Sequence, residues 1–294
     1  MGKKNVSDFM KMYVSTIGDN LAEIEPIMDE LGIKGAVSLE QFEGVFSLAA
    51  NDLAGRWNEG TKTLRTAMAY GTVPGYPEGV LLTSIVVDSF VNLIDDVFDE
   101  ATTKQERAPF VIEMIRVLAV LNKQGLSERT QHRISHYLNK LLCIGVPEMA
   151  FTARIRSSRK FGERLSFSVQ CYDCKRLDID FFFELPLLEL GFGEKDIGEL
   201  LRLARIFRAI HLIKKDFRDI KHDSENGTET PLIILSEEGT LLGKYMDSLI
   251  GHYEKECKKF KPADFHEELR PVAERLLDSI SEEVEGYRRE SKEI

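Results

Sequence analysis

Apolar residues recur at three- and four-residue steps along most of the chain, which is the spacing of one face of an α-helix. One such run extends from Val111 to Leu121 and another from Leu200 to Leu212. The segment 181–188 is apolar at almost every position, and a helix that is apolar nearly all round must be buried. No alternating run is flanked by a hairpin turn. The pattern therefore predicts an all-α protein, a bundle built around central helices.

The length of 294 residues suits either one large domain or two smaller ones. No linker-like stretch divides the chain, and no segment repeats at a fixed period. We therefore expect a single α-helical domain over residues 1–294. Within it we expect a polar loop at 223–230 and a strongly charged helix over the last thirty residues.

The charge balance and the apolar runs of the sequence narrow what the protein could bind and where it could reside. The chain has 39 Lys and Arg against 49 Asp and Glu, a net charge of −10, and this argues against a nucleic-acid binder, which needs a basic surface. The chain contains no run of 18 apolar residues, so the sequence predicts no membrane span. The first residues lack the apolar stretch of a secretory signal, so we expect a cytoplasmic protein whose four cysteines stay reduced.

An acidic stripe follows the apolar helix expected at about 78–100. No Lys or Arg on this helix pairs with the stripe, and two like charges near 4 Å repel by about 4 kcal/mol at an effective dielectric of 20. A solvated helix face is one reading. A site for a divalent cation is the other, because Mg²⁺ binds one or two carboxylates together with substrate phosphates. The polar positions step by four, three and four residues and so share one face: Asp88, Asn92, Asp95 and Asp99, with Asp96 beside them.

A second acidic cluster has the same helical spacing. Asp216, Asp219 and Asp223 step by three and four residues, with several Lys and Arg around them. Ordinary surface ion pairs would also give this pattern. Taken with the first stripe, the cluster predicts two acidic helix faces that converge on one site for a metal and an anion.

Both clusters resemble the metal-binding motifs of the class I isoprenoid synthases, which include trans-prenyltransferases, squalene and phytoene synthases, and class I terpene synthases. The first motif, D-D-x-x-D, reads Asp95-Asp96-Val97-Phe98-Asp99, and the second is similar to Asp216-Phe217-Arg218-Asp219 followed by Asp223, with Lys215 in place of its first Asp. The resemblance implies the class I terpenoid synthase fold, a prenyl diphosphate substrate, and two or three Mg²⁺ ions. These ions would be bound by Asp95, Asp96, Asp99, Asp216, Asp219 and Asp223.

Shorter segments extend the resemblance. The segment 60–65 is similar to the G-G-K-x-x-R segment that holds isopentenyl diphosphate in elongating enzymes, which implies Lys62 and Arg65 as ligands of a second substrate. Tyr172-x-x-Lys175 looks like the lysine segment that contacts the allylic diphosphate. The basic tail from Tyr287 looks like those that close over diphosphate. The arginine pair that usually follows the first motif in prenyltransferases is absent, as is an intact N-D-x-x-S-x-x-x-E motif.

The chemistry of such enzymes requires cations for a leaving diphosphate and a dry, aromatic pocket for a carbocation. A solvated helix face would also explain the basic residues, and plain core would explain the aromatic ones. The candidate diphosphate ligands are Arg154, Arg156, Arg159, Lys175, Arg176, Lys215 and Arg288. The candidate pocket residues are Phe90, Asn92, Phe167, Tyr172, Phe207 and His211.

The sequence thus predicts a Mg²⁺-dependent enzyme that ionises an allylic prenyl diphosphate. The missing arginine pair and Lys215 favour a terpene synthase, a carbon–oxygen lyase. A trans-prenyltransferase or a head-to-head synthase is the alternative within the superfamily. A non-catalytic helical binding protein is the alternative of another class. We leave open a homodimer, and we expect residues 223–230 and the tail from Tyr287 to close over bound substrate.

Overall fold

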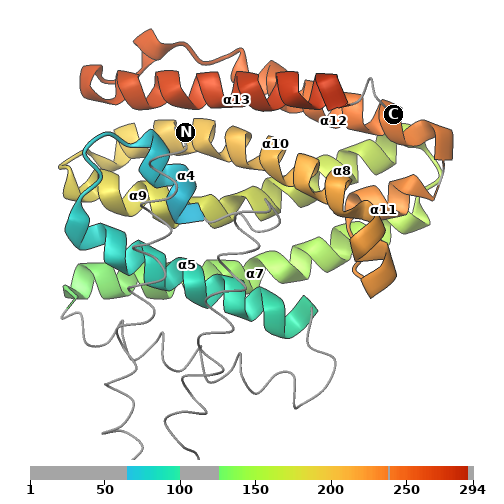
Figure 1. Cartoon of the computed structure of the whole chain (residues 1–294), viewed down its shortest axis with the longest axis horizontal. Coiled ribbons are helices and arrows are strands. Elements are labelled where there is room, and N and C mark those ends of the chain that lie inside the picture. Colours follow the sequence, from blue (N-terminus) through green and yellow to red (C-terminus); the bar gives the residue numbers. More distant parts are fainter. Residues whose placement is uncertain (1–64, 100–125, 238, 291–294) are drawn as a thin grey trace, which may run out of the picture. The chain divides into compact units, whose positions relative to one another are not determined.

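The computed structural model describes residues 65–99, 126–237 and 239–290, which contain helices and no strands (Figure 1). The all-helical prediction is confirmed for this part of the chain. The longer helices are α4 (Arg65–Thr72), α5 (Glu78–Asp99), α7 (Glu128–Ser157), α8 (Phe161–Lys175), α9 (Asp180–Glu189), α10 (Glu194–Asn226), α11 (Pro231–Ser236), α12 (Leu242–Cys257) and α13 (Arg270–Glu290). Short 3-10 turns are η2 (Arg176–Ile179), η3 (Gly239–Leu241), η4 (Pro262–Asp264) and η5 (Glu267–Leu269).

The chain divides into two compact units. The first comprises residues 1–71 and 76–131, and the second comprises residues 72–75 and 132–294. Helix α5 and most of α4 belong to the first unit. The second unit contains most of α7 and everything from α8 to α13. The single domain expected from the sequence stays a prediction.

Helix α5 of the first unit forms where the apolar period predicts it, from Glu78 to Asp99. Pro77 precedes it, and the carboxylate of Glu78 in its first turn favours the positive end of the helix dipole. Its apolar side chains pack inward, because burying each removes apolar surface from water. The buried set comprises Val80, Leu81, Ile85, Val86, Val87 and Val91.

Helix α10 is the centre of the second unit. It contacts α8, η2, α9, α11, α12 and α13. In Figure 1, α13 runs along one side of α10 and α9 along the other. The helix is long enough to carry two kinds of residue. Apolar side chains such as Leu200, Ala204 and Ile213 fill the core, while charged side chains occupy its C-terminal half.

The segment predicted to be buried on all sides is helix α9. Phe182, Phe183 and Leu187 are fully buried, and Phe181 stacks on Tyr137 of α7 with ring centroids 5.0 Å apart. Each buried Phe contributes roughly 2–3 kcal/mol relative to an exposed one. This prediction is confirmed.

The loop expected at 223–230 is shorter than predicted. Helix α10 continues to Asn226, and Gly227 then ends it with φ of +73°, a left-handed conformation that glycine adopts without steric cost. The backbone N–H of Thr228 donates to the carbonyl oxygen of Asp223 at 2.9 Å. Thr230 is already the N-cap of α11, where its side chain accepts from the N–H of Ile233. Local capping therefore converts half of the expected loop into helix.

The C-terminal residues through Glu290 belong to helix α13. Tyr287 is buried, and its hydroxyl donates to Asp247 of α12 at 2.8 Å. Arg288 pairs with Glu254, also on α12, at 2.7 Å. In the described residues, no helix is both long and apolar enough to cross a membrane.

Candidate functional site

Three carboxylates line one side of α10 near its C-terminus, and we call Asp216, Asp219 and Asp223 the α10 acidic face. Asp216 is buried and the other two are half-buried. Burial raises the pKa of Asp223, and the charges of Asp216 and Asp219 raise it further. Burial also raises the pKa of Asp219, where Lys215 opposes the change and Asp216 adds to it. The structure thus brings together the second cluster predicted from the sequence.

Helix α8 meets the α10 acidic face at Asp216. The hydroxyl of Tyr172 donates to Oδ2 of Asp216 at 2.9 Å, and Nζ of Lys175 lies 3.8 Å from the same oxygen. Tyr172 is fully buried. Burial, followed by the charge of Asp216, raises the pKa of Tyr172 well above its ordinary value, so the hydroxyl stays protonated and can donate. Lys175 and Tyr172, which lie 41 and 44 positions before Asp216 in the sequence, therefore converge on the first carboxylate of the cluster.

The positive groups beside the α10 acidic face include exposed ones. Besides Lys175, Nζ of Lys215 lies 4.0 Å from Asp219, with its side chain 40% exposed, and Nδ1 of His222 lies 3.7 Å from Asp223, with its side chain 73% exposed. An exposed pair of this kind compensates little charge. The C-terminus of a helix also carries partial negative charge, which disfavours carboxylates and favours a cation. The α10 acidic face is therefore a place where an additional cation would be stabilised.

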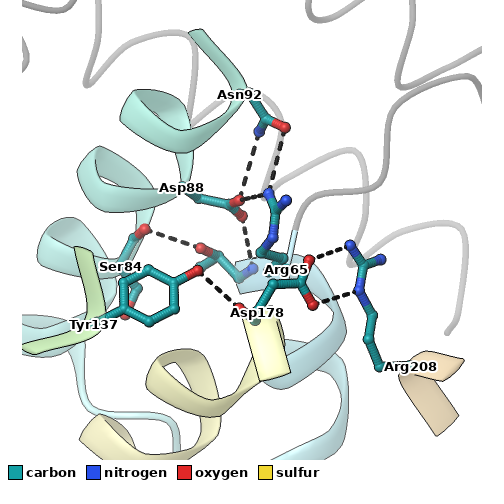
Figure 2. Close-up of polar contacts among 8 residues, drawn as sticks. Arg65, Ser84, Asp88, Asn92, Tyr137, Asp178 and Arg208 are labelled. Atoms are coloured by element: carbon teal, nitrogen blue, oxygen red, sulfur yellow. Dashed lines mark hydrogen bonds and ion pairs between the residues drawn. The ribbon is translucent and has the colours of Figure 1, made fainter. Parts of the chain in front are cut away.

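The same side of α10 carries two arginines that sequence reasoning did not select. Arg208 forms two hydrogen bonds with Asp178 of η2, at 2.9 and 2.5 Å, and Figure 2 shows them beside the bond of 2.8 Å from Tyr137 to the carbonyl of Asp178. Arg205 likewise binds both oxygens of Asp180, at 2.7 and 2.8 Å. The residue types at these positions are visible in the sequence, but only the structure identifies them as facing ion pairs.

The residues that pair with α10 follow one another along the chain in the opposite direction to their partners on α10. Residues 172, 178 and 180 meet residues 216, 208 and 205 in turn. The segment from α8 through η2 to the start of α9 therefore runs antiparallel to α10. At the end near residue 205 each cation has an acidic partner. At the end near residue 216, Asp216 meets Tyr172 and Lys175, and the half-buried Asp219 and Asp223 follow it on α10.

Most of the remaining predicted diphosphate ligands pair with other groups. The guanidinium of Arg154 lies over the rings of Phe151 and Phe167, at 5.9 and 5.7 Å from their centroids. Arg159 is exposed. The other three form ion pairs with carboxylates outside the α10 acidic face: Arg156 with Glu229 and Glu237, Arg176 with Asp173 and Glu256, and Arg288 with Glu254.

His211, predicted for the pocket, belongs to a cluster between α10 and α13. Its Nδ1 lies 3.5 Å from Oε1 of Glu283, and Nζ of Lys214 donates to Oε2 of the same carboxylate at 2.5 Å. Burial lowers the pKa of His211. Burial acts to raise the pKa of Glu283, but hydrogen bonds from His211 and Lys214 outweigh it and bring that pKa to about 2. Phe207, also predicted for the pocket, is half-buried.

In the first unit, the polar stripe of α5 begins with a carboxylate that has a partner. Asp88 is completely buried; its Oδ1 lies 3.2 Å from Nη1 of Arg65, and its Oδ2 accepts from the N–H of Thr66 at 2.8 Å. Asn92 completes the group, with its Oδ1 3.4 Å from Nη1 of Arg65 (Figure 2). The sequence showed no cation on α5 itself. The cation comes instead from the first residue of α4.

The first acidic motif lies on the last turns of α5. The side chains of Asp95, Asp96, Asp99 and Phe90 are outside the described residues, and so is all of Lys62. Convergence of the two acidic motifs stays a prediction. Arg65 and Asn92, predicted for a second substrate and for the pocket, are both held by Asp88.

The oxygen ligands of the α10 acidic face suit Mg²⁺, which binds one or two carboxylates and completes its shell with water and phosphate oxygens. In the part of the chain that the structure describes, no group of three or more His, Cys, Asp or Glu side chains is arranged to hold a metal ion by itself.

Comparisons with known proteins gave no match to this chain, whether with family models, with curated proteins or with solved structures.

Proposed function

We propose that the protein is a Mg²⁺-dependent enzyme of the class I isoprenoid synthase type that ionises an allylic prenyl diphosphate, and that it acts as a terpene synthase. The proposal includes the class I terpenoid synthase fold and joins the resemblance of the two aspartate motifs to the geometry around Asp216. In this reaction a carbon–oxygen bond breaks, diphosphate leaves, and the allylic cation cyclises or is quenched inside the protein.

The observation that carries the proposal is the convergence of Tyr172 and Lys175 on Asp216. A buried carboxylate, a fixed hydroxyl and an ammonium meet there, and two further carboxylates follow on the same side of α10. Burial raises the pKa of Asp219 and of Asp223, and the charge of Asp216 adds to the rise at both, so their ionised forms are disfavoured without a ligand. A divalent cation would stabilise the ionised carboxylates, and the cation in turn would attract diphosphate.

The residues of the chain have distinct tasks in this proposal. The α10 acidic face would hold Mg²⁺, and the resemblance assigns the same task to Asp95, Asp96 and Asp99. When bound, Mg²⁺ supplies electrostatic stabilisation of the leaving diphosphate. Tyr172 orients Asp216 through its hydroxyl. Lys175 and Lys215 supply ammonium groups on the same side of α10.

The environment of Arg65 favours a terpene synthase over the elongating prenyltransferase. An elongating enzyme needs cations that are available to the diphosphate of isopentenyl diphosphate. Here the Arg65 guanidinium lies against the completely buried carboxylate of Asp88. That carboxylate neutralises the guanidinium and would repel a second diphosphate at this place.

Product analysis with labelled substrates tests the proposal. The protein is incubated with farnesyl or geranylgeranyl diphosphate, with and without isopentenyl diphosphate, in Mg²⁺ or in excess chelator. We expect a Mg²⁺-dependent hydrocarbon or alcohol that forms without isopentenyl diphosphate. A longer diphosphate formed only with isopentenyl diphosphate would show that the protein is a prenyltransferase.

Matched variants separate the metal site from general effects of charge. Asp216→Asn and Asp95→Asn should each lower turnover by orders of magnitude while the helical circular dichroism is retained. Asp278→Asn removes the same charge from an exposed position on α13 and should leave turnover unchanged. Equal activity of all three variants would contradict the proposed site.

A non-catalytic helical binding protein is the alternative of another class. Its acidic residues would be solvated, so Mg²⁺ and inorganic diphosphate together should leave its melting temperature unchanged. The enzyme proposed here should be stabilised by the pair, because a ligand that binds only the folded state stabilises it by mass action.

A further inference from the structure

Two cations from different helices share one buried carboxylate at the start of α9. Arg205 of α10 donates from Nε and Nη2 to Oδ1 and Oδ2 of Asp180, at 2.7 and 2.8 Å. Lys140 of α7 donates from Nζ to Oδ2 of the same carboxylate. The side chain of Asp180 is only 6% exposed. One buried negative charge thus holds two positive charges in place.

Neither of these cations has a second carboxylate in the part of the chain that the structure describes. There, Asp180 is the one acidic partner of both Lys140 and Arg205. The neighbouring arginines, Arg133 and Arg208, are paired with other carboxylates of the same region. The group of three side chains at Asp180 therefore carries one positive charge in excess.

Both cations keep donor groups that Asp180 does not use. A guanidinium carries five N–H donors, and the carboxylate engages only those of Nε and Nη2, which leaves Nη1 of Arg205. An ammonium carries three donors, and Lys140 uses one of them on Asp180. The side chains of Arg205 and Lys140 are 28% and 27% exposed, so small solutes reach them from the solvent.

This arrangement favours an anion with several strong acceptor oxygens. A phosphate group has three such oxygens, and its hydrogen bonds with guanidinium and ammonium groups are charge-assisted. Because Asp180 already holds both side chains, little of their conformational freedom is lost when an anion binds. Their partial burial suits a small anion better than a broad charged surface.

We propose that Lys140 and Arg205 form a binding site for a small anion that bears a phosphate group, with Asp180 holding both cations in place. The site is separate from the α10 acidic face, because residues 205 and 216 lie about 17 Å apart along the axis of α10. Its ligands are cations, so the anion binds without a metal ion. The inference therefore goes beyond the proposed function and does not rest on it.

Calorimetric titration of the full-length chain tests the site with inorganic phosphate as the probe. The buffer contains excess chelator, and sodium chloride keeps the ionic strength constant, so that general screening does not change. Lys140→Met removes the surplus charge and leaves Arg205 and Asp180 as a balanced pair, so the helical circular dichroism should be retained. We expect this variant to bind phosphate about tenfold more weakly than the wild type.

Lys195→Met is the matched control. It removes the same charge from an exposed position in the first turn of α10, away from Asp180. We expect the affinity for phosphate to change by less than about twofold in this variant. Equal losses in the two variants would overturn the proposal, because phosphate binding would then reflect net charge. A wild type that binds no phosphate at concentrations up to about 10 mM would overturn it as well.

Lysine acetylation of the wild-type protein, read by mass spectrometry, gives a second measurement that does not depend on a variant folding. Saturating phosphate should slow the reaction of Lys140 and leave that of Lys195 unchanged, whereas chloride at the same ionic strength should protect neither. Equal reactivity of Lys140 with phosphate and with chloride would overturn the proposal. Both measurements are made without Mg²⁺ or a prenyl diphosphate, so failure of the proposed function would not alter their outcome.

Discussion

The contact between α10 and α13 allows a stability prediction worked from the structure. Glu283 of α13 accepts from Lys214 at 2.5 Å and lies 3.5 Å from His211, with its own side chain 24% exposed. Lys214 is 7% exposed. Glu283→Gln keeps the shape of the side chain and removes its charge, which leaves the ammonium buried without a counter-ion.

The magnitude follows from the pKa of Glu283, which falls from its ordinary 4.5 to about 2 in the folded chain. This difference corresponds to about 3 kcal/mol in favour of the ionised form. Because the folded pKa is depressed, the stabilisation is fully present above pH 4.5 and is lost as the pH falls through about 2. The free energy of unfolding should therefore drop by about 3 kcal/mol in the variant at pH 7, and by roughly half as much at pH 3.

Urea unfolding followed by circular dichroism, at pH 7 and at pH 3, measures both differences. Glu282→Gln is the control, because it removes the same charge from the exposed neighbouring position. It should change the free energy of unfolding by less than about 0.5 kcal/mol. Equal effects of the two variants at pH 7, or a Glu283→Gln effect that does not shrink in acid, would refute the reasoning.

Three further predictions concern other contacts. Arg65→Met should lower the free energy of unfolding by about 3 kcal/mol at pH 7 and by less at pH 4, because Asp88, whose pKa burial raises, can take up a proton in acid. Urea unfolding at both pH values measures the difference, and an unchanged stability would mean that the arginine serves only a ligand. Gly198→Ala, where a Cβ meets nothing within 4 Å, should stabilise by about 0.5–1 kcal/mol, whereas Gly286→Ala should stabilise less, because its added Cβ would lie 2.9 Å from Nζ of Lys214, the end of a flexible side chain that must shift; thermal unfolding of the two variants gives the comparison. Asp219→Asn should retain or slightly raise the melting temperature, because the raised pKa of Asp219 marks a charge that the fold disfavours. The same variant should lose the binding of Mg²⁺ with diphosphate. If it unfolds instead, Asp219 is a structural carboxylate.

Much of the helical structure could be predicted from local pattern. The helix expected at about 78–100 is α5, and the nearly continuous apolar segment 181–188 lies in the buried helix α9. These predictions succeed because the position of a helix depends on an apolar period within one segment. The end of α10 was harder to predict, because a glycine cap and a threonine N-cap only a few residues apart shorten a polar stretch that looked like a loop.

The candidate site divides in the same way. The spacing of Asp216, Asp219 and Asp223 along one helix predicted that they share a side, and they do. The tail from Tyr287 was predicted to close over substrate on the basis of its basic residues. That pattern could not show that Tyr287 is buried against α12. Charge and spacing identify residue types on a face, but not the element that the face meets.

By itself, the sequence determined that this protein is helical, where several of its helices lie, and which side of each helix is acidic, because these follow from residues a few positions apart. Only the tertiary structure decided which charges have partners. Arg65 meets Asp88, Tyr172 meets Asp216, and Lys214 meets Glu283, across separations of 23, 44 and 69 residues. Such contacts require the packing and the rotation of two helices to agree to within a hydrogen-bond length, and no pattern within one segment specifies that agreement.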